Sequence, residues 1–391
     1  EAPAGPGARA VFRRCNRAFR LSFAVALAVA PALPQAQQAH AQQLPTGGSV
    51  AAGSANIGTP SNGTLNINQT SDRAVINWDS FSVGQGGTVN FNQPSAASAT
   101  LNRVTGNTPS SIAGAINAPG TVLLVNPNGI AITKDGVINV GSFAASALRI
   151  KDSDFMSGNY RFTGNGSSAD VTNAGRINVS DGGFAALLGG HVANDGMISA
   201  RLGKVALGSG ELITLDLAGD GFMAVAVPTS ALRDIKDGQG RSLVSNKGRI
   251  AADGGMVYLR AATAAGLLRD AVNVPGSIRA NSVGTRNGKI VIGGGAGGKV
   301  RVSGRVKVDS RNVAGGSVTV TGARTEVSGK ISATSKTNKG GVVIVTADQV
   351  TLGDTALLDA SGASGGSLLI GGDYQGGNGD KKFSIEPVAN A

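Results

Sequence analysis

Short motifs recur along the chain, several of them at intervals of 21 or 25 residues, and this repetition constrains the fold more than any other feature of the sequence. A motif of the form Asn-x-Gly-x-Ile begins at Asn173 and again 21 residues later at Asn194, and a third copy begins at Asn246. Pairs of glycines that each precede a short apolar run begin at Gly315, Gly340 and Gly365. A unit of this length cannot bury its own apolar side, but stacked units bury one continuous core. The repeats therefore predict a solenoid.

The composition narrows the solenoid to one built from β-strands. Glycine supplies 60 of the 391 residues, against 13 prolines, and only 15 % of the residues are charged. Collagen needs glycine at every third position and much proline, so it is excluded. Coils of about 20–25 residues fit a parallel β-helix, whereas β-propeller blades need about 40–45 residues. We expect an all-β parallel β-helix of about 15 coils, at about 23 residues per coil.

The first forty residues have the order of a secretory signal peptide. Five arginines come first, and an apolar run of 13 residues follows at 21–33. A membrane-spanning helix needs about 20 apolar residues, so we expect a cleaved leader rather than an anchor. The small residues Ala39 and Ala41 predict cleavage before Gln42, which makes residues 1–41 the signal peptide.

Cysteine and histidine are scarce, and this limits the chemistry of the chain. The one cysteine, Cys15, lies within the signal peptide, and His40 and His191 are the two histidines. We therefore expect neither a disulfide within the chain nor a zinc site. The glycines between 293 and 298 have the spacing of a dinucleotide-binding loop, but alternating valines follow them where such a loop needs a helix. No metal or cofactor is expected.

Two stretches of the sequence read INWDSFSVGQGGTVNFNQPSAASATLNRVTG at 76–106 and TVLLVNPNGI at 121–130. Together they resemble the secretion domain of two-partner-secreted exoproteins, the filamentous-haemagglutinin-like adhesins. The resemblance continues to about Val227, although a second motif of one subgroup, Asn-Pro-Asn-Leu, is missing here. The matching elements are Trp78 and Phe81, VNF at 89–91, LNRVTG at 101–106, the run at 112–116, Asn126-Pro127-Asn128-Gly129, and FAAS at 143–146.

The resemblance implies a fold, a route of export and a partner. It implies a right-handed parallel β-helix that is exported by the general secretory machinery and then passes through an outer-membrane β-barrel transporter with periplasmic binding repeats. We expect residues 42–155 to be the two-partner secretion domain with an N-terminal β cap about a hundred residues long. Residues 156–391 are then β-helix repeats that continue beyond the end of the chain. The expected product is a secreted, cell-surface, adhesin-type rod that does not span a membrane and whose targets are host glycans or receptors.

The run Asn126-Pro127-Asn128-Gly129 fits a type I turn that closes the apolar strand at 122–125. Two interpretations stay open: the run is only a turn, or the corner also keeps a transporter-binding surface in register. Arg103 is either a transporter contact or a surface charge. Trp78 and Phe81 are expected to pack inside the cap.

Basic residues alternate with valines between 299 and 308, so their side chains are expected to share one outer face. The residues of this stripe are Lys299, Arg301, Arg305 and Lys307. The stripe would hold acidic glycans, sulfated polysaccharide or lipopolysaccharide phosphate, or it is a solvated face that discourages aggregation. Nucleic acid is not expected as a partner, because few aromatic residues are present to stack on bases.

Two other functions stay open. A β-helical enzyme acting on polysaccharides would need two convergent carboxylates. Asp216 and Asp220 are the candidates, but Asp220-Gly221 also fits a turn, and we do not expect an enzyme. The other alternative is the stalk of a contact-dependent growth-inhibition toxin, whose toxic end would lie beyond Ala391.

Overall fold

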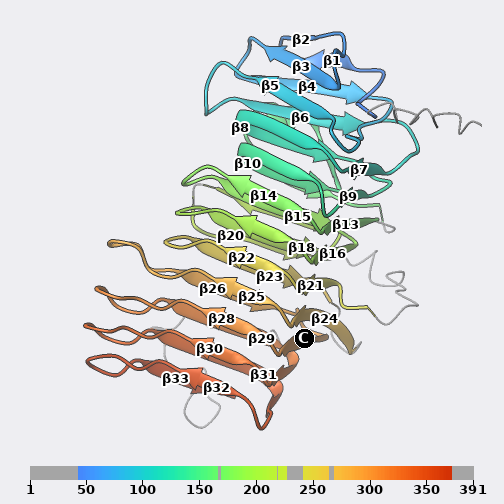
Figure 1. Cartoon of the computed structure of the whole chain (residues 1–391). Coiled ribbons are helices and arrows are strands. Elements are labelled where there is room, and N and C mark those ends of the chain that lie inside the picture. The colour runs from blue at the N-terminus through green and yellow to red at the C-terminus, as the bar shows by residue number, and fades with distance from the viewer. Residues whose placement is uncertain (1–42, 166–168, 218, 227–240, 264–267, 372–391) are drawn as a thin grey trace, which may run out of the picture. The chain divides into compact units, whose positions relative to one another are not determined.

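A computed structural model describes residues 43–165, 169–217, 219–226, 241–263 and 268–371, all within the unit Ala41–Ala391. In this part of the chain, 29 strands join one sheet, and four more form a second sheet. Strands of successive coils lie side by side in chain order, from blue to red in Figure 1. Nearly all their pairings are parallel and join one coil to the next, which confirms the predicted parallel β-helix.

From residue 110 onward each described coil has three strands, which form three ladders that we name face A, face B and face C, and the two coils before residue 110 have strands on faces B and C. Face A contains β7 (Ser110–Ile112), β9 (Ile130–Ile132), β13 (Asp170–Asn173), β16 (His191–Asn194), β21 (Val244–Asn246), β24 (Arg269–Val274), β27 (Gly298–Val302) and the second halves of β29 (Ser317–Val327) and β31 (Val342–Leu352). Face B contains β3 (Thr64–Gln69), β5 (Thr88–Asn92), the first parts of β8 (Ala115–Val125) and β10 (Val137–Ser146), then β14 (Arg176–Val179), β17 (Met197–Ser199), β22 (Arg249–Ala251), β25 (Ser277–Arg279), β28 (Arg305–Lys307), β30 (Lys330–Ser332) and β32 (Leu357–Asp359). Face C contains β4 (Arg73–Trp78), β6 (Ala99–Val104), the second parts of β8 and β10, then β15 (Phe184–Gly189), β18 (Lys204–Ser209), β23 (Met256–Ala261), β26 (Lys289–Gly293), the first halves of β29 and β31, and β33 (Ser367–Ile370).

Columns of aliphatic side chains fill the interior of the coils. The column on face B stays in register from strand to strand, and every member is fully buried. Its members are Ile177, Ile198, Ile250, Ile278, Val306 and Ile331. Because strand side chains alternate, the residues on either side of each member point outward.

The repeated motifs occupy equivalent places in successive coils. Asn173, Asn194 and Asn246 are aligned on face A, where each buried side-chain amide donates to the next across 2.7 Å. A Cβ atom on Gly248 would overlap the carbonyl oxygen of Gly196, its equivalent one coil earlier. The motif therefore repeats because coil stacking needs an amide at one position and the absence of a side chain two positions later.

The antiparallel cap is shorter than expected. It consists of β1 (Ser49–Ala52), which pairs with β4, and β2 (Ala55–Ile57), which pairs with β3. Parallel stacking already begins with β3 and β5. Trp78 and Phe81 are buried with their rings edge to face at 5.5 Å, which confirms that they pack inside.

A second layer, which the sequence did not predict, covers the outside of face C. It contains β11 (Arg149–Ile150), the helix α1 (Asp152–Met156), β12 (Tyr160–Thr163), β19 (Leu212–Asp216) and β20 (Phe222–Ala226). Phe155, Phe162 and Phe222 of this layer are fully buried in a second apolar core. The second layer uses residues that the estimate of about 15 coils had assigned to the β-helix. The described residues place 11 successive strands on face B, which is fewer than the 15 coils expected.

Within the ranges described, no helix is long and apolar enough to cross a membrane. The predicted division between residues 155 and 156 stays a prediction.

Candidate functional site

The four residues 126–129 form a tight turn between β8 and β9. The backbone N–H of Gly129 donates to the carbonyl oxygen of Asn126 across 3.0 Å, which is the hydrogen bond that closes a β-turn. Gly129 has a φ of +110°, a conformation that favours glycine. The backbone N–H of Asn128 donates to Oδ1 of Asn126 across 2.9 Å. The predicted turn is present.

The inner half of the turn is tied to the coil. Asn126 is fully buried, and its Nδ2 donates to the carbonyl oxygen of Thr108 and to Oγ of Ser110, both across 2.9 Å. Its backbone N–H donates to the carbonyl oxygen of Ser146 in the next coil across 2.9 Å. Asn126 thus joins the turn to an earlier loop and a later strand.

The outer half of the turn is open to solvent. Pro127 is half-buried and Asn128 is exposed. The Nδ2 of Asn128 donates to the carbonyl oxygen of Gly106 across 2.9 Å, and this contact orients the amide along the surface. Pro127 and Asn128 are therefore the part of the motif that another protein can contact.

Arg103 fastens the second layer to face C. Its Nη2 donates to the carbonyl oxygen of Ile150 across 2.9 Å and forms an ion pair with Asp152. Its Nη1 donates to Oδ1 of Asn77 across 3.4 Å. With 22 % of its side chain exposed, Arg103 is largely committed to contacts within the chain. Its predicted role as a transporter contact stays a prediction.

A pocket of about 540 Å³ opens beside the outer half of the turn. Pro127 and Asn128 line one side of it, and Arg103, Arg149 and Lys151 supply its charged groups. Asp152 neutralises Arg103, whereas Arg149 and Lys151 are exposed. Since no carboxylate of the described chain pairs with these two cations or lines the pocket, the pocket carries a net positive charge.

Sequence reasoning missed Arg149 and Lys151. They flank Ile150. Arg149 and Ile150 form the two-residue strand β11, whose antiparallel partner is β12, and Lys151 lies between β11 and α1. The one local signal is the alternation of two basic residues around a buried isoleucine. That signal predicts a strand, but it does not say that the strand leaves the coil and lies beside the turn.

The predicted basic stripe divides between two faces. Lys299 and Arg301 point outward from β27 on face A, whereas Arg305 and Lys307 point outward from β28 on face B. The corner at 303–304 separates the two strands. The expectation of one shared face is wrong, because alternation holds within a strand and is interrupted at a corner.

Most of the charge in the stripe is neutralised. On face A, Arg301 lies 3.1 Å from Asp270 and 3.4 Å from Glu326, and Lys299 lies 3.9 Å from Glu326. On face B, Lys307 lies 3.0 Å from Asp309. Arg305 is exposed and has no ion pair with a carboxylate of the described residues.

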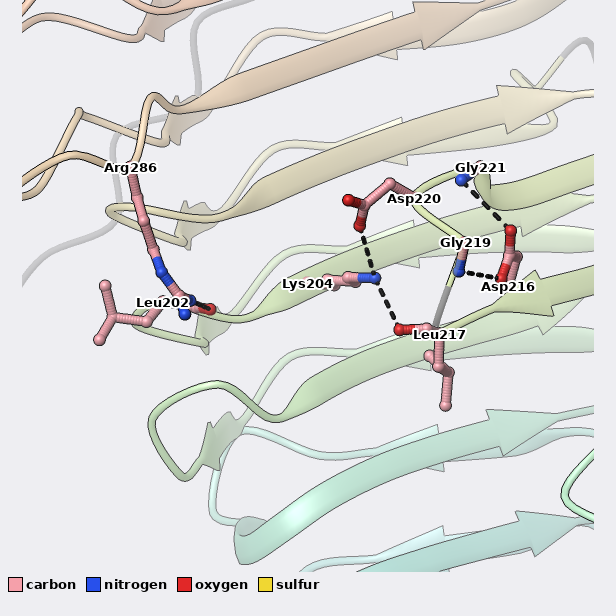
Figure 2. Close-up of polar contacts among 8 residues, drawn as sticks. All are labelled: Leu202, Lys204, Asp216, Leu217, Gly219, Asp220, Gly221 and Arg286. Atoms are coloured by element: carbon pink, nitrogen blue, oxygen red, sulfur yellow. Dashed lines mark hydrogen bonds and ion pairs between the residues drawn. The ribbon is translucent and has the colours of Figure 1, made fainter.

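The two candidate catalytic carboxylates lie in one turn (Figure 2). The carboxylate of Asp216 accepts hydrogen bonds from the backbone N–H of Gly219 across 2.7 Å and from that of Gly221 across 3.3 Å. Asp220 has a φ of +60° and lies 3.4 Å from Nζ of Lys204. These contacts are those of a turn, and the enzyme alternative stays open. No group of three or more metal-ligating side chains occurs within the described ranges.

The predicted cleavage residues Ala39, Ala41 and Gln42 lie outside the described residues.

Comparison with known proteins places these features in a family. The model of the TPS secretion domain family matches residues 41–308. A heme/hemopexin-binding protein of Haemophilus influenzae is 35 % identical over 269 residues, which cover 66 % of this chain and 28 % of that protein. A second protein of the same name and species is 29 % identical over 249 residues, or 58 % of this chain and 26 % of that protein. The match thus spans less than a third of the length of either relative.

Two solved structures are similar to this fold. The HMW1 secretion domain from Haemophilus influenzae has a TM-score of 0.69 and 27 % identity, and the match covers 84 % of this chain and 96 % of that chain. The filamentous hemagglutinin secretion domain has a TM-score of 0.47 and 14 % identity, with 84 % of this chain and 99 % of that chain covered.

Proposed function

The chain belongs to the TPS secretion domain family, and from this premise we propose that it recognises its outer-membrane transporter through the outer half of the turn at 126–129 and the basic pocket beside it. Two-partner-secreted exoproteins are exported to the cell surface or the extracellular space. The transporter must therefore distinguish this chain from other proteins in the periplasm, and it needs a surface on the chain to do so.

One observation carries the proposal: a single four-residue motif has a structural half and an exposed half. The side-chain amide of Asn126 donates to the coil and its Oδ1 accepts within the turn, whereas Asn128 is exposed at the edge of a pocket with two unpaired cations. Nδ2 of Asn128 donates to the carbonyl oxygen of Gly106 and to Oδ1 of Asn126, and these two contacts hold its exposed amide along the surface beside the pocket. The pocket would accept a carboxylate-bearing segment of the transporter's periplasmic repeats.

The test replaces the exposed half and leaves the buried half in place. We expect the double variant Pro127→Ala/Asn128→Ala to lose secretion through the transporter, while the free energy of unfolding of the purified protein falls by less than about 1 kcal/mol. Asn126→Ala is the matched control: it should lower stability by about 2–3 kcal/mol, because burial of its unpaired partners is costly. If secretion of the unmodified protein, the double variant and Asn126→Ala varied only with their stability, the motif would act only as a turn.

The role of the exported protein at the cell surface is a separate proposal. We infer an adhesin-type role, because the sequence resembles the filamentous-haemagglutinin-like adhesins. Capture of heme or hemopexin is the second candidate, because both curated relatives are named heme/hemopexin-binding proteins. The longer of the two matches covers 28 % of the relative's length, so a part of that protein outside the match can bind the ligand in its name. Binding of the secreted protein to immobilised hemopexin, with and without heme, against binding to host cells would separate the two roles.

We propose further that the chain has no catalytic activity. The two carboxylates that would carry it serve a turn and a lysine contact. Polysaccharide turnover by the purified protein that is abolished by Asp220→Asn would establish the enzyme alternative. A stalk that delivers a toxin would instead require a toxic segment encoded beyond residue 391.

A further inference from the structure

Positive charge gathers in the second part of the chain. Residues 241–371 contain 17 lysines and arginines against 7 aspartates and glutamates, whereas residues 43–226 contain 9 against 11. The later coils therefore generate a positive field that the earlier coils do not.

Face A of these coils presents only a small part of that charge. Its outward positions hold Asp270 and Glu326 among the basic residues, and the four side chains of Asp270, Lys299, Arg301 and Glu326 form one ion-pair network. Lys299 and Arg301 are therefore neutralised, and the exposed cation that remains beside them on face A is Arg324, which forms no ion pair with a carboxylate of the described residues.

Face B presents the charge openly. Arg249, Arg305 and Lys330 occupy the same outward position on β22, β28 and β30, with Ser277 of β25 between the first two. All three cations are exposed. None of them forms an ion pair with a carboxylate of the described chain. The four strands follow one another in the lower half of Figure 1.

Two pockets flank the same strands. One, of about 360 Å³, runs along the corners before β25, β28 and β30, where Ser277, Ser303 and Ser328 alternate with glycines beside Arg305 and Lys330. The other, of about 580 Å³, lies beyond the far ends of these strands and adds Arg311 and Lys336, both exposed. Cations thus lie on both sides of one set of coils, with hydroxyl groups between them.

We propose that face B from β22 to β30, together with its two flanking pockets, binds a linear polysaccharide that carries sulfate or carboxylate groups. Neighbouring strands lie about 4.8 Å apart, so Arg305 and Lys330 are adjacent and Arg249 is about 10 Å further along the stack. A chain that lies along the stack meets cations at these intervals and serine hydroxyl groups at the corners. Nucleic acid fits less well, because the strands of this surface carry no aromatic side chain for base stacking.

Asp309 limits the positive charge of this surface. Its carboxylate lies 3.0 Å from Nζ of Lys307 and accepts a hydrogen bond from the backbone N–H of Thr334 across 3.0 Å. Replacement by asparagine keeps an acceptor for Thr334 and releases Lys307 to the surface. The surface therefore offers a change that should strengthen binding as well as changes that should weaken it.

The test compares two double variants that lose the same charge. Arg305→Ala/Lys330→Ala removes unpaired cations from face B, and Lys299→Ala/Arg301→Ala removes paired cations from face A. With heparin as the probe, we expect the first variant to bind on the order of tenfold more weakly and the second to bind almost as the unmodified protein does. If both variants lost the same affinity for heparin, binding would depend only on the net charge of the protein, and the proposal would be overturned. Circular dichroism and the thermal midpoint establish that each variant is folded.

Two further measurements make the test specific. Asp309→Asn should bind heparin more tightly than the unmodified protein, and no gain would contradict the role of Lys307 on this surface. Free sulfate at the same sulfate concentration as heparin should compete poorly, because the proposal requires several groups on one polymer. A DNA duplex that competes as well as heparin, with the same loss in Arg305→Ala/Lys330→Ala, would replace the polysaccharide with nucleic acid.

Discussion

Glycine residues of this chain divide into those that stacking requires and those that it does not. At Gly196, Gly248 and Gly276, a Cβ atom would overlap the carbonyl oxygen of the equivalent glycine one coil earlier. Gly365, by contrast, has no atom within 4 Å of the place where its Cβ would lie. A column of glycines at one corner therefore lets successive coils approach at strand spacing, and this explains much of the high glycine content.

Gly248→Ala should lower the free energy of unfolding by about 2 kcal/mol or more, because the backbone of two coils must move apart to admit one methyl group. Gly365→Ala is the matched control and should change it by less than about 0.5 kcal/mol. Denaturant unfolding of both variants measures the difference. If the two substitutions changed the free energy of unfolding equally, close approach of the coils would not be the reason for glycine at position 248.

Asp309 links one side chain to the pH dependence of stability. Burial raises the pKa of Asp309, but hydrogen bonds from Thr334 and Ser332 and the charge of Lys307 outweigh it, so the pKa lies below its ordinary value of 3.8. A carboxyl whose pKa is lowered by folding stabilises the protein above its unfolded pKa, and this contribution is lost as the pH falls through the folded pKa.

Asp309→Asn should therefore be less stable than the unmodified protein by a constant amount between about pH 5 and pH 7. The gap should narrow as the pH falls below about 4 and close below the lowered pKa, where the carboxyl is protonated in the folded protein as well. Unfolding free energies at pH 7, 5 and 3 check this. A gap that is the same at pH 3, or that has already closed at pH 5, would mean that the charge of Asp309 does not carry the effect.

At the scale of elements, the coils could be predicted from the sequence and the second layer could not. Asparagine recurs at 173, 194 and 246 because its side chain hydrogen-bonds to the equivalent asparagine of the next coil. Each repeat therefore determines its own register. β12 instead pairs with β19, which lies about fifty residues further along, and β11 has only two residues. Nothing in a short alternating run tells whether the strand stays in the coil.

The candidate site likewise has one part that could be predicted from the sequence, the turn, and one part that could not, the pocket. Four consecutive residues were enough to predict the turn, because asparagine, proline and glycine have conformational preferences of their own. The pocket beside the turn depends on Arg149 and Lys151, and these come from the second layer. The part of the site that could be predicted is therefore the part made by one segment.

Arg149→Ala/Lys151→Ala should weaken secretion through the transporter without a loss of stability, because both side chains are exposed and their charge is unpaired within the described chain. Lys134→Ala/Arg161→Ala removes the same charge from exposed positions that do not line the pocket, and it is the control. Secreted protein in the medium, relative to protein in the cells, measures the effect. Normal secretion of the pocket variant would remove the pocket from the proposed contact and leave the turn.

At the scale of the whole described unit, the coils are held together in two ways. Every coil stacks on its neighbours through the interior core, but the second apolar core adds a further layer that extends from Val75 on β4 to Val291 on β26. The strands from β27 onward have only nearest-neighbour stacking within the described residues. In such a solenoid, stability is close to a sum of local terms, so parts that are held differently can open separately.

We therefore expect β29 to β33 to lose protection from hydrogen exchange at lower denaturant concentration than β4 to β18. Mass spectrometry of peptides from both regions in increasing guanidinium measures this order. Phe162 is fully buried in the second core, so Phe162→Ala should cost about 3–5 kcal/mol there. That variant should lower the protection of β4 to β18 and leave β29 to β33 unchanged. One transition for all strands, shifted as a whole by Phe162→Ala, would show instead that stacking alone couples every coil and that the second layer adds nothing local.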